Sequence, residues 1–110
     1  MTDTQQKRIN KLNEFLKKDQ TDSFSKFALA LEYVNLSELE KARALFEDIQ
    51  ENDPEYVGLY YHLGKLYEKL DEAGLAIITY NKGIEIAEKA GDDHSAAELR
   101  QALLELELEN

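Results

Sequence analysis

Cysteine is absent from this sequence, and the residues that make tight turns are scarce. The 110 residues include no cysteine, one proline and five glycines. The lack of cysteine excludes a disulfide scaffold, a cysteine-ligated zinc site and a cysteine nucleophile. All-β domains need more turn residues than are present here, so an all-helical fold is favoured. The length suits one domain with a core of its own.

Long apolar runs and an excess of positive charge are also missing. The sequence has no apolar stretch of 18 residues, and its opening residues MTDTQQKRINKL contain no apolar run. We therefore expect a cytoplasmic protein with no membrane span and no secretory signal. Asp and Glu number 23 against 13 Lys and Arg, for a net charge of −10. Such a surface repels phosphate backbones and anionic lipids, so neither nucleic acid nor a membrane is an expected partner.

Apolar residues recur at helical spacing almost throughout, and cap-type residues divide them into six predicted helices. The first helix is expected over residues 3–18. The later ones are expected to begin at Thr21 or Asp22, at a Ser37/Glu40 capping box, at Asp53-Pro54, at Asp71, and at Asp92 or Asp93. Gly91 is expected to end the fifth helix in a left-handed conformation. Short connections predict that neighbouring helices run antiparallel.

The sequence repeats itself at an offset of 34 residues. This shift aligns Leu29 with Leu63, Ala30 with Gly64, Tyr33 with Tyr67, Ala42 with Ala76, and Phe46 with Tyr80. A 34-residue period of two helices resembles the tetratricopeptide repeat (TPR). Seven of that motif's eight marked positions match at Tyr60, Leu63, Gly64, Tyr67, Ala76, Tyr80 and Gly83, while Glu88 replaces its proline. The preceding unit matches at Leu29, Ala30, Tyr33, Ala42, Phe46 and Pro54, but has Lys26 in place of an aromatic residue and Ile49 in place of a small one.

The resemblance implies an all-α domain of antiparallel helix pairs stacked in a short right-handed superhelix. We expect a single domain over 1–110, with an N-terminal capping helix (1–20), repeat 1 (21–54), repeat 2 (55–90) and a C-terminal capping helix (91–110). The first helix falls at the phase of the second helix of a missing upstream repeat. The last helix falls at the phase of the first helix of a third repeat. Each unit must be stacked, since it cannot bury its apolar faces alone.

Proteins of this family resemble one another in binding partners on the concave face formed by the first helix of each pair. By phase, the residues expected there are Phe24, Phe27, Leu31, Asn35, Tyr61, His62, Lys65, Lys69, Ser95 and Leu99. An apolar strip beside two lysines is typical of a binding surface. The strip expected here consists of Phe27, Leu31, Tyr61 and Leu99, with Lys65 and Lys69 beside it. We therefore expect a non-catalytic protein-interaction module whose partner offers apolar anchors and basic flanks. The alternative is that neighbouring side chains or the terminal helices simply cover the strip.

Catalytic and cofactor motifs are not recognisable in the sequence. The glycines are isolated, so no glycine-rich loop can hold a phosphate, and the serines lie near predicted helix starts. His62, His94 and the pair Asp92-Asp93 are the only hint of metal chemistry. Helix capping explains the two aspartates better, so we expect neither a metal, a cofactor nor enzymatic activity.

The two ends differ in charge and suggest a second function. Residues 1–20 have five Lys or Arg and three acidic residues, whereas residues 91–110 have one Arg and six acidic residues. The last helix also has two apolar faces, one with Leu99, Leu103 and Leu106 and another with Leu104 and Leu108. A spare face could pair with a second copy, so the alternative function is a homo-oligomer that uses the groove or this helix. A frayed terminal helix is an equally good explanation.

Overall fold

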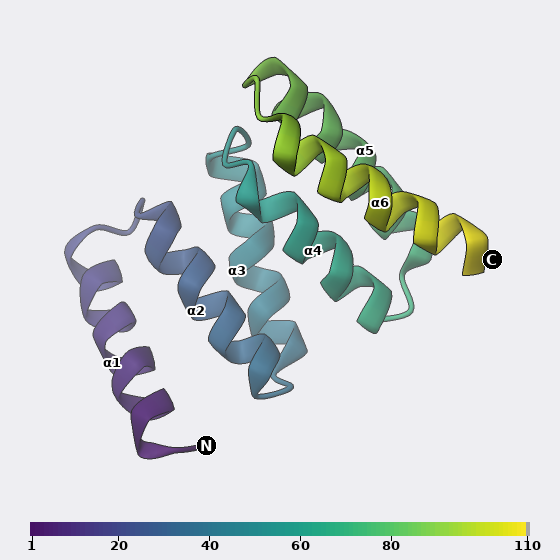
Figure 1. Ribbon diagram of the computed structural model, residues 1–110. Helices are drawn as coiled ribbons and strands as arrows, with labels where there is room; N and C mark the ends of the chain where they lie inside the picture. The colour runs from purple at the N-terminus through teal and green to yellow at the C-terminus, as the bar shows by residue number, and fades with distance from the viewer. Residues whose placement is uncertain (110) are drawn as a thin grey trace. The chain divides into compact units, whose positions relative to one another are not determined.

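The computed structural model describes residues 1–109, which form six α-helices and no strand (Figure 1). The helices are α1 (Asp3–Lys18), α2 (Ser23–Asn35), α3 (Leu39–Asn52), α4 (Gly58–Lys69), α5 (Ala73–Lys89) and α6 (Asp93–Glu109). The all-α prediction is therefore confirmed. The chain forms two compact units, Met1–Pro54 with α1 to α3 and a second that begins at Glu55 with α4 to α6. None of the helices in the described part of the chain is both long and apolar enough to cross a membrane.

In the first unit, α2 packs between α1 and α3. The buried side chains of this unit include Ile9, Leu29, Ala30, Ala42, Phe46 and Ile49. The rings of Phe27 and Phe46 lie 5.9 Å apart and are tilted by 57°, a favourable arrangement for aromatic pairs. The small residues Ala30 and Ala42 of the repeat are therefore part of the core of this unit, as their size predicts.

In the second unit, α5 packs against α4, and α6 covers both helices. A Cβ atom added to Gly64 would overlap the ring of Tyr80, and one added to Gly83 would overlap Tyr60. Both tyrosines are fully buried. The hydroxyl of Tyr80 donates a hydrogen bond to Glu68, which satisfies its polar end. Burial and this hydrogen bond together raise the pKa of Tyr80 well above its ordinary value.

The two units differ at one pair of equivalent positions. The second unit combines Tyr60 with Gly83, so an aromatic side chain lies across a residue that has none. The first unit has Lys26 and Ile49 at the same places, 34 residues earlier. Ile49 is fully buried, and Lys26 is only 7% exposed, with its Nζ 3.1 Å from Oδ2 of Asp48. A thin lysine stem thus takes the place of an aromatic ring where the facing residue is large.

Three helices end in the same motif, in which a residue with positive φ follows the helix and its neighbour closes a 6→1 hydrogen bond. The amides of Glu38, Glu72 and Asp92 donate to carbonyls five residues earlier, at 2.8, 2.8 and 2.9 Å. The residues with positive φ are Ser37 (59°), Asp71 (58°) and Gly91 (71°). The predicted ending at Gly91 is confirmed.

The predicted caps are confirmed at two helices and wrong at two. Asp22 and Asp92 accept hydrogen bonds from the amides of Ser25 and Ser95, at 3.1 and 3.0 Å, as N-caps do. By contrast, α3 and α5 begin without a side-chain cap within the described residues. Ser37 and Asp71, expected to cap them, belong instead to the ends of the preceding helices.

The predicted start of the fourth helix is also wrong. Pro54 lies in a turn, and α4 begins only at Gly58. Asp53 does not cap this helix, since its Oδ2 accepts a 2.6 Å hydrogen bond from the hydroxyl of Ser23. The carboxylate therefore ties the end of α3 to the start of α2.

Candidate functional site

Helix α2 carries the four predicted surface residues of the first unit. Phe24 is 66% exposed and Asn35 is exposed, whereas Phe27 and Leu31 are half-buried. The ring contact between Phe27 and Phe46 assigns part of Phe27 to the core. The outer surface of α2 is therefore apolar at its N-terminal end, where Phe24 is the most accessible side chain.

Helix α4 carries four predicted residues of the second unit, and three of them form one cluster. The rings of Tyr61 and His62 lie 5.4 Å apart, edge to face. Nζ of Lys65 lies 5.6 Å from the centroid of the Tyr61 ring. That ammonium group is also 3.8 Å from Glu68, while Lys69 is exposed. Burial lowers the pKa of His62, and the charge of Glu98 partly opposes this effect. The imidazole therefore favours its neutral form.

A hollow of about 380 Å³ lies beside Tyr61, between α4 and α6. Its other lining residues, all from α6, are His94, Ala97, Glu98, Gln101, Ala102 and Glu105. The alanines leave room, and the carboxylates of Glu98 and Glu105 make the rim acidic. The amide of Gln101 donates to Glu105 at 2.9 Å and holds that carboxylate on the helix surface. The surface beside Tyr61 therefore carries the negative charges of Glu98 and Glu105 as well as the positive charge of Lys65.

Leu99 does not line this hollow. Its side chain is 1% exposed, and a Cβ added to Gly83 would lie 3.0 Å from its Cδ1. The leucine is part of the core between α5 and α6, so it is not offered to a partner. Ser95 is half-buried, and its hydroxyl donates a 2.7 Å hydrogen bond to Oδ2 of Asp92. The predicted residues thus fall into an α2 set in the first unit and an α4 set in the second.

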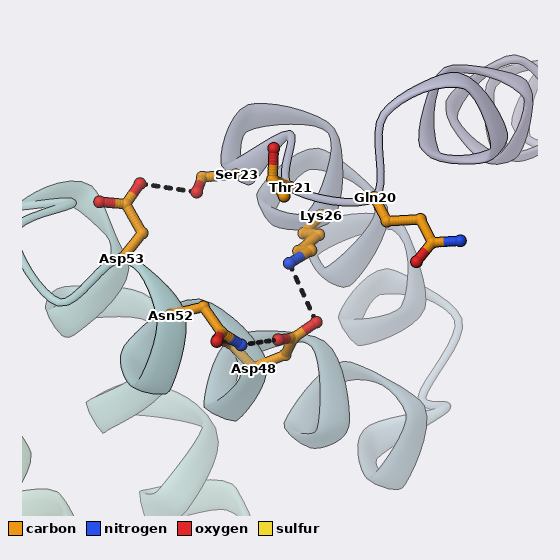
Figure 2. A pocket seen from close by; sticks show the side chains of 7 residues that line it. All are labelled: Gln20, Thr21, Ser23, Lys26, Asp48, Asn52 and Asp53. Carbon is orange, nitrogen blue, oxygen red and sulfur yellow. Dashed lines mark hydrogen bonds and ion pairs between the residues drawn. The ribbon is translucent and has the colours of Figure 1, made fainter.

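The first unit has a larger hollow, of about 480 Å³, where the start of α2 meets the end of α3 (Figure 2). Figure 2 shows Lys26 directed at Asp48, and Ser23 at Asp53. The amide of Asn52 also donates to Asp48. These polar groups satisfy one another, so the hollow is a structural polar cluster that locks two helices together.

The histidines and aspartates considered for metal binding do not assemble. Among residues 1–109, no three His, Asp or Glu side chains form a group that could hold a metal ion. His94 lies 3.8 Å from Glu98 on the exposed side of α6, and Asp92 is engaged as a helix cap. The aspartate therefore has the structural role that its position predicts.

The comparisons with known proteins agree with the repeat. A family model described as tetratricopeptide repeat matches residues 57–89. No curated protein matches the sequence. A crystal structure of a tetratricopeptide repeat domain protein from Salinibacter ruber is 49% identical, aligns over 78% of this chain and 96% of the other, and gives a TM-score of 0.75. A solution structure of a tetratricopeptide repeat domain protein from the same organism is also 49% identical. It aligns over 78% of this chain and 87% of the other, with a TM-score of 0.76.

A more distant structure, from Bordetella parapertussis, is similar in fold alone. It is 22% identical, aligns over 92% of this chain and 88% of the other, and has a TM-score of 0.79. The Salinibacter crystal structure, by contrast, is 49% identical over 96% of its own length, so the similarity extends from the fold to the family. The chain belongs to the tetratricopeptide repeat family, whose helical-repeat domains serve in general as protein–protein interaction modules.

Proposed function

We propose that this protein is a non-catalytic interaction module that binds a peptide or protein segment at the hollow beside Tyr61. The observation that carries the proposal is the combination of an accessible aromatic ring, small alanines and an acidic rim on one face of the second unit. Aromatic residues in partly desolvated hollows are the usual anchors of protein interfaces. The hollow is large enough for side chains of a bound segment.

The charges around Tyr61 select the partner's chemistry. Glu98 and Glu105 face the hollow, whereas Lys65 already lies close to Glu68 and the Tyr61 ring. We therefore propose a segment that places an apolar side chain against Tyr61 and a basic side chain near the two carboxylates. The net charge of −10 favours approach of the same kind of partner. In the first unit, Phe24 and the half-buried Phe27 and Leu31 of α2, with Asn35, offer a second, apolar contact surface.

Affinity capture with single variants tests this proposal. The protein is immobilised, partners are captured from a cytosolic extract, and a partner so identified is titrated against each variant. We expect Tyr61→Ala to weaken binding by about 30-fold, the effect of about 2 kcal/mol at an anchor. Glu98→Gln and Glu105→Gln should weaken it less, and more at low salt than at high salt.

Matched substitutions separate the hollow from the rest of α6. Glu107→Gln removes the same charge from the same helix at a residue that does not line the hollow, so binding should be unchanged. Phe24→Ala tests the α2 surface in the same way. If Tyr61→Ala binds like the wild type while remaining folded, the proposed surface is wrong.

Self-association is a second candidate, favoured by one observation. Leu104 and Leu108 of α6 are 51% and 77% exposed, on a side of the helix away from its buried residues. Exposed leucines one helical turn apart are typical of a surface that a second helix covers. Light scattering across a wide range of concentrations tests this candidate, which a strict monomer would contradict.

A further inference from the structure

We propose that the protein associates head to tail, with the Leu104–Leu108 edge of α6 in one copy docked against the α1/α2 side of the next. The inference rests on self-association, the second candidate function, and names the two surfaces that meet. It requires that each copy carry a donor edge in its second unit and an acceptor hollow in its first.

The donor edge is apolar at its centre and acidic at its border. Leu104 and Leu108 lie on α6 with Ala97 and Gln101, which are also exposed and fall on the same side at helical spacing. The buried residues Ala96, Leu99, Ala102 and Leu106 occupy the opposite side. The exposed residues Glu105, Glu107 and Glu109 flank the two leucines. The edge therefore presents leucines within a carboxylate border.

The acceptor is a hollow of about 220 Å³ between α1 and α2, lined by Arg8, Lys11, Leu12, Ala28 and Glu32. This volume is below the roughly 300 Å³ at which small-molecule sites begin, so it suits an inserted side chain. Arg8 is paired with Glu32 at 2.6 Å. Lys11 lies 5.5 Å from the ring of Phe15, which is 41% exposed and extends the apolar surface along α1.

Charge complementarity identifies a second copy as the occupant. Helix α1 carries five Lys or Arg and two acidic residues, whereas α6 carries one Arg and five acidic residues. The basic helix α1 of one copy would attract the acidic helix α6 of another, whereas two α1 helices or two α6 helices would repel each other. An apolar edge with carboxylates thus fits an apolar hollow whose border includes Lys11.

The phase of the two terminal helices supports the same pairing. Within the 34-residue repeat, α1 falls at the phase of a second helix and α6 at the phase of a first helix. Helix α6 of one copy and α1 of the next would together supply the two helix types of one repeat, the unit from which such proteins are built. Because the two surfaces differ, the contact is heterologous and can continue from copy to copy.

Sedimentation velocity with three samples tests the proposal. The wild type should show an average mass that rises with concentration and falls with added salt, since the contact is small and partly electrostatic. The donor variant Leu104→Glu/Leu108→Glu and the acceptor variant Lys11→Glu/Phe15→Glu should each raise the concentration needed for association at least tenfold. All four positions are exposed, so both variants should keep the circular dichroism and melting temperature of a folded protein.

Mixing the two variants gives the sharpest outcome. Each variant retains one intact surface, so an equimolar mixture should form a 1:1 dimer that does not grow further. A symmetrical contact through α6 alone would leave the mixture without such a dimer. Ala28→Leu, which fills the hollow without changing charge, should behave like the acceptor variant. The matched control is Ile78→Glu on α5, a 65% exposed residue outside both surfaces, which should associate like the wild type.

Three results would overturn the inference. A wild type that is monomeric at every concentration removes self-association itself. Association that the donor variant disrupts and the acceptor variant does not would mean that α6 meets another surface. Association that neither variant disrupts would keep the second candidate function and reject both surfaces proposed for it.

Discussion

Gly64 packs directly against the ring of Tyr80, so that a Cβ atom at position 64 would overlap the aromatic carbons. Helices α4 and α5 can approach this closely only because the residue has no side chain. We expect Gly64→Ala to lower the free energy of unfolding by about 1–3 kcal/mol, the usual effect of overpacking a core. Urea denaturation monitored by circular dichroism measures the change.

The control for this substitution is Gly74→Ala in α5. Among the described residues, a Cβ at position 74 would meet no atom within 4 Å apart from its chain neighbours and the backbone of its own helix, and alanine is the better helix former. Gly74→Ala should therefore stabilise the protein by about 0.5–1 kcal/mol. Equal effects of the two substitutions would contradict close packing at Gly64.

The three helix ends with positive φ give a second prediction. Gly91→Ala should destabilise the protein by about 1–2 kcal/mol, since a Cβ is disfavoured in the left-handed conformation although the space around it is open. Ser37→Gly removes the same penalty and should raise the melting temperature. A lower melting temperature for Ser37→Gly, measured by calorimetry, would show that the serine side chain stabilises this turn.

The Lys26–Asp48 ion pair gives a third prediction. The Lys26 side chain is 9% exposed, whereas that of Asp48 is 41% exposed. Asp48→Asn should destabilise by about 1 kcal/mol, because it leaves a buried ammonium group without its counter-charge. Lys26→Met should stay within about 1 kcal/mol of the wild type, because an apolar chain of similar shape replaces the buried charge. The reverse order in urea denaturation would contradict this account.

The lowered pKa of His62 predicts how stability depends on pH. Burial favours the neutral imidazole in the folded state, so below about pH 6.5 the unfolded chain binds a proton more readily than the folded one. Stability should therefore fall as the pH drops from 6.5 towards the lower pKa of the folded state. His62→Gln should reduce this loss, and His94→Gln, at an 85% exposed position, is the matched surface variant. Urea midpoints at pH 7.5, 6.0 and 5.0 measure it.

The core could be predicted from sequence because its residue types fit only one arrangement. Ala42 and Ala76 are small and recur 34 residues apart, and both are fully buried. The aromatic residues Phe46 and Tyr80, at the same offset, are fully buried too. Recurrence of small and aromatic residues at one fixed offset is typical of close helix packing, so the repeat identified which side of each of these helices is buried.

The helix boundaries were less predictable because one residue type suits two roles. Serine and aspartate cap helix starts, and both also tolerate the turn that ends a helix. Ser37 and Asp71 occupy the second role, which nothing in their local sequence distinguishes from the first. Asp53 was expected to cap α4, and its bond to Ser23, thirty residues earlier, depends on how α2 and α3 pack.

The acidic surroundings of Tyr61 were missed for a related reason. The phase of α6 is poorly defined by sequence, since apolar residues occur on both of its sides. The sequence pattern consequently places Leu99 on the binding surface and does not bring Glu98 and Glu105 beside Tyr61, whereas the structure buries Leu99 and places both glutamates around the hollow. Contacts of α6 with α4 and α5 were needed to identify which side is exposed.

The different residue pairs at equivalent positions of the two units limit how this protein can change. Tyr60 needs Gly83 beside it, and Lys26 occurs with the bulky Ile49. Exchanging a single helix between the units would bring Tyr60 together with Ile49, or Lys26 together with Gly83, and create a clash or a void. Recombination, whether in evolution or in the laboratory, should therefore succeed with whole helix pairs and fail with single helices.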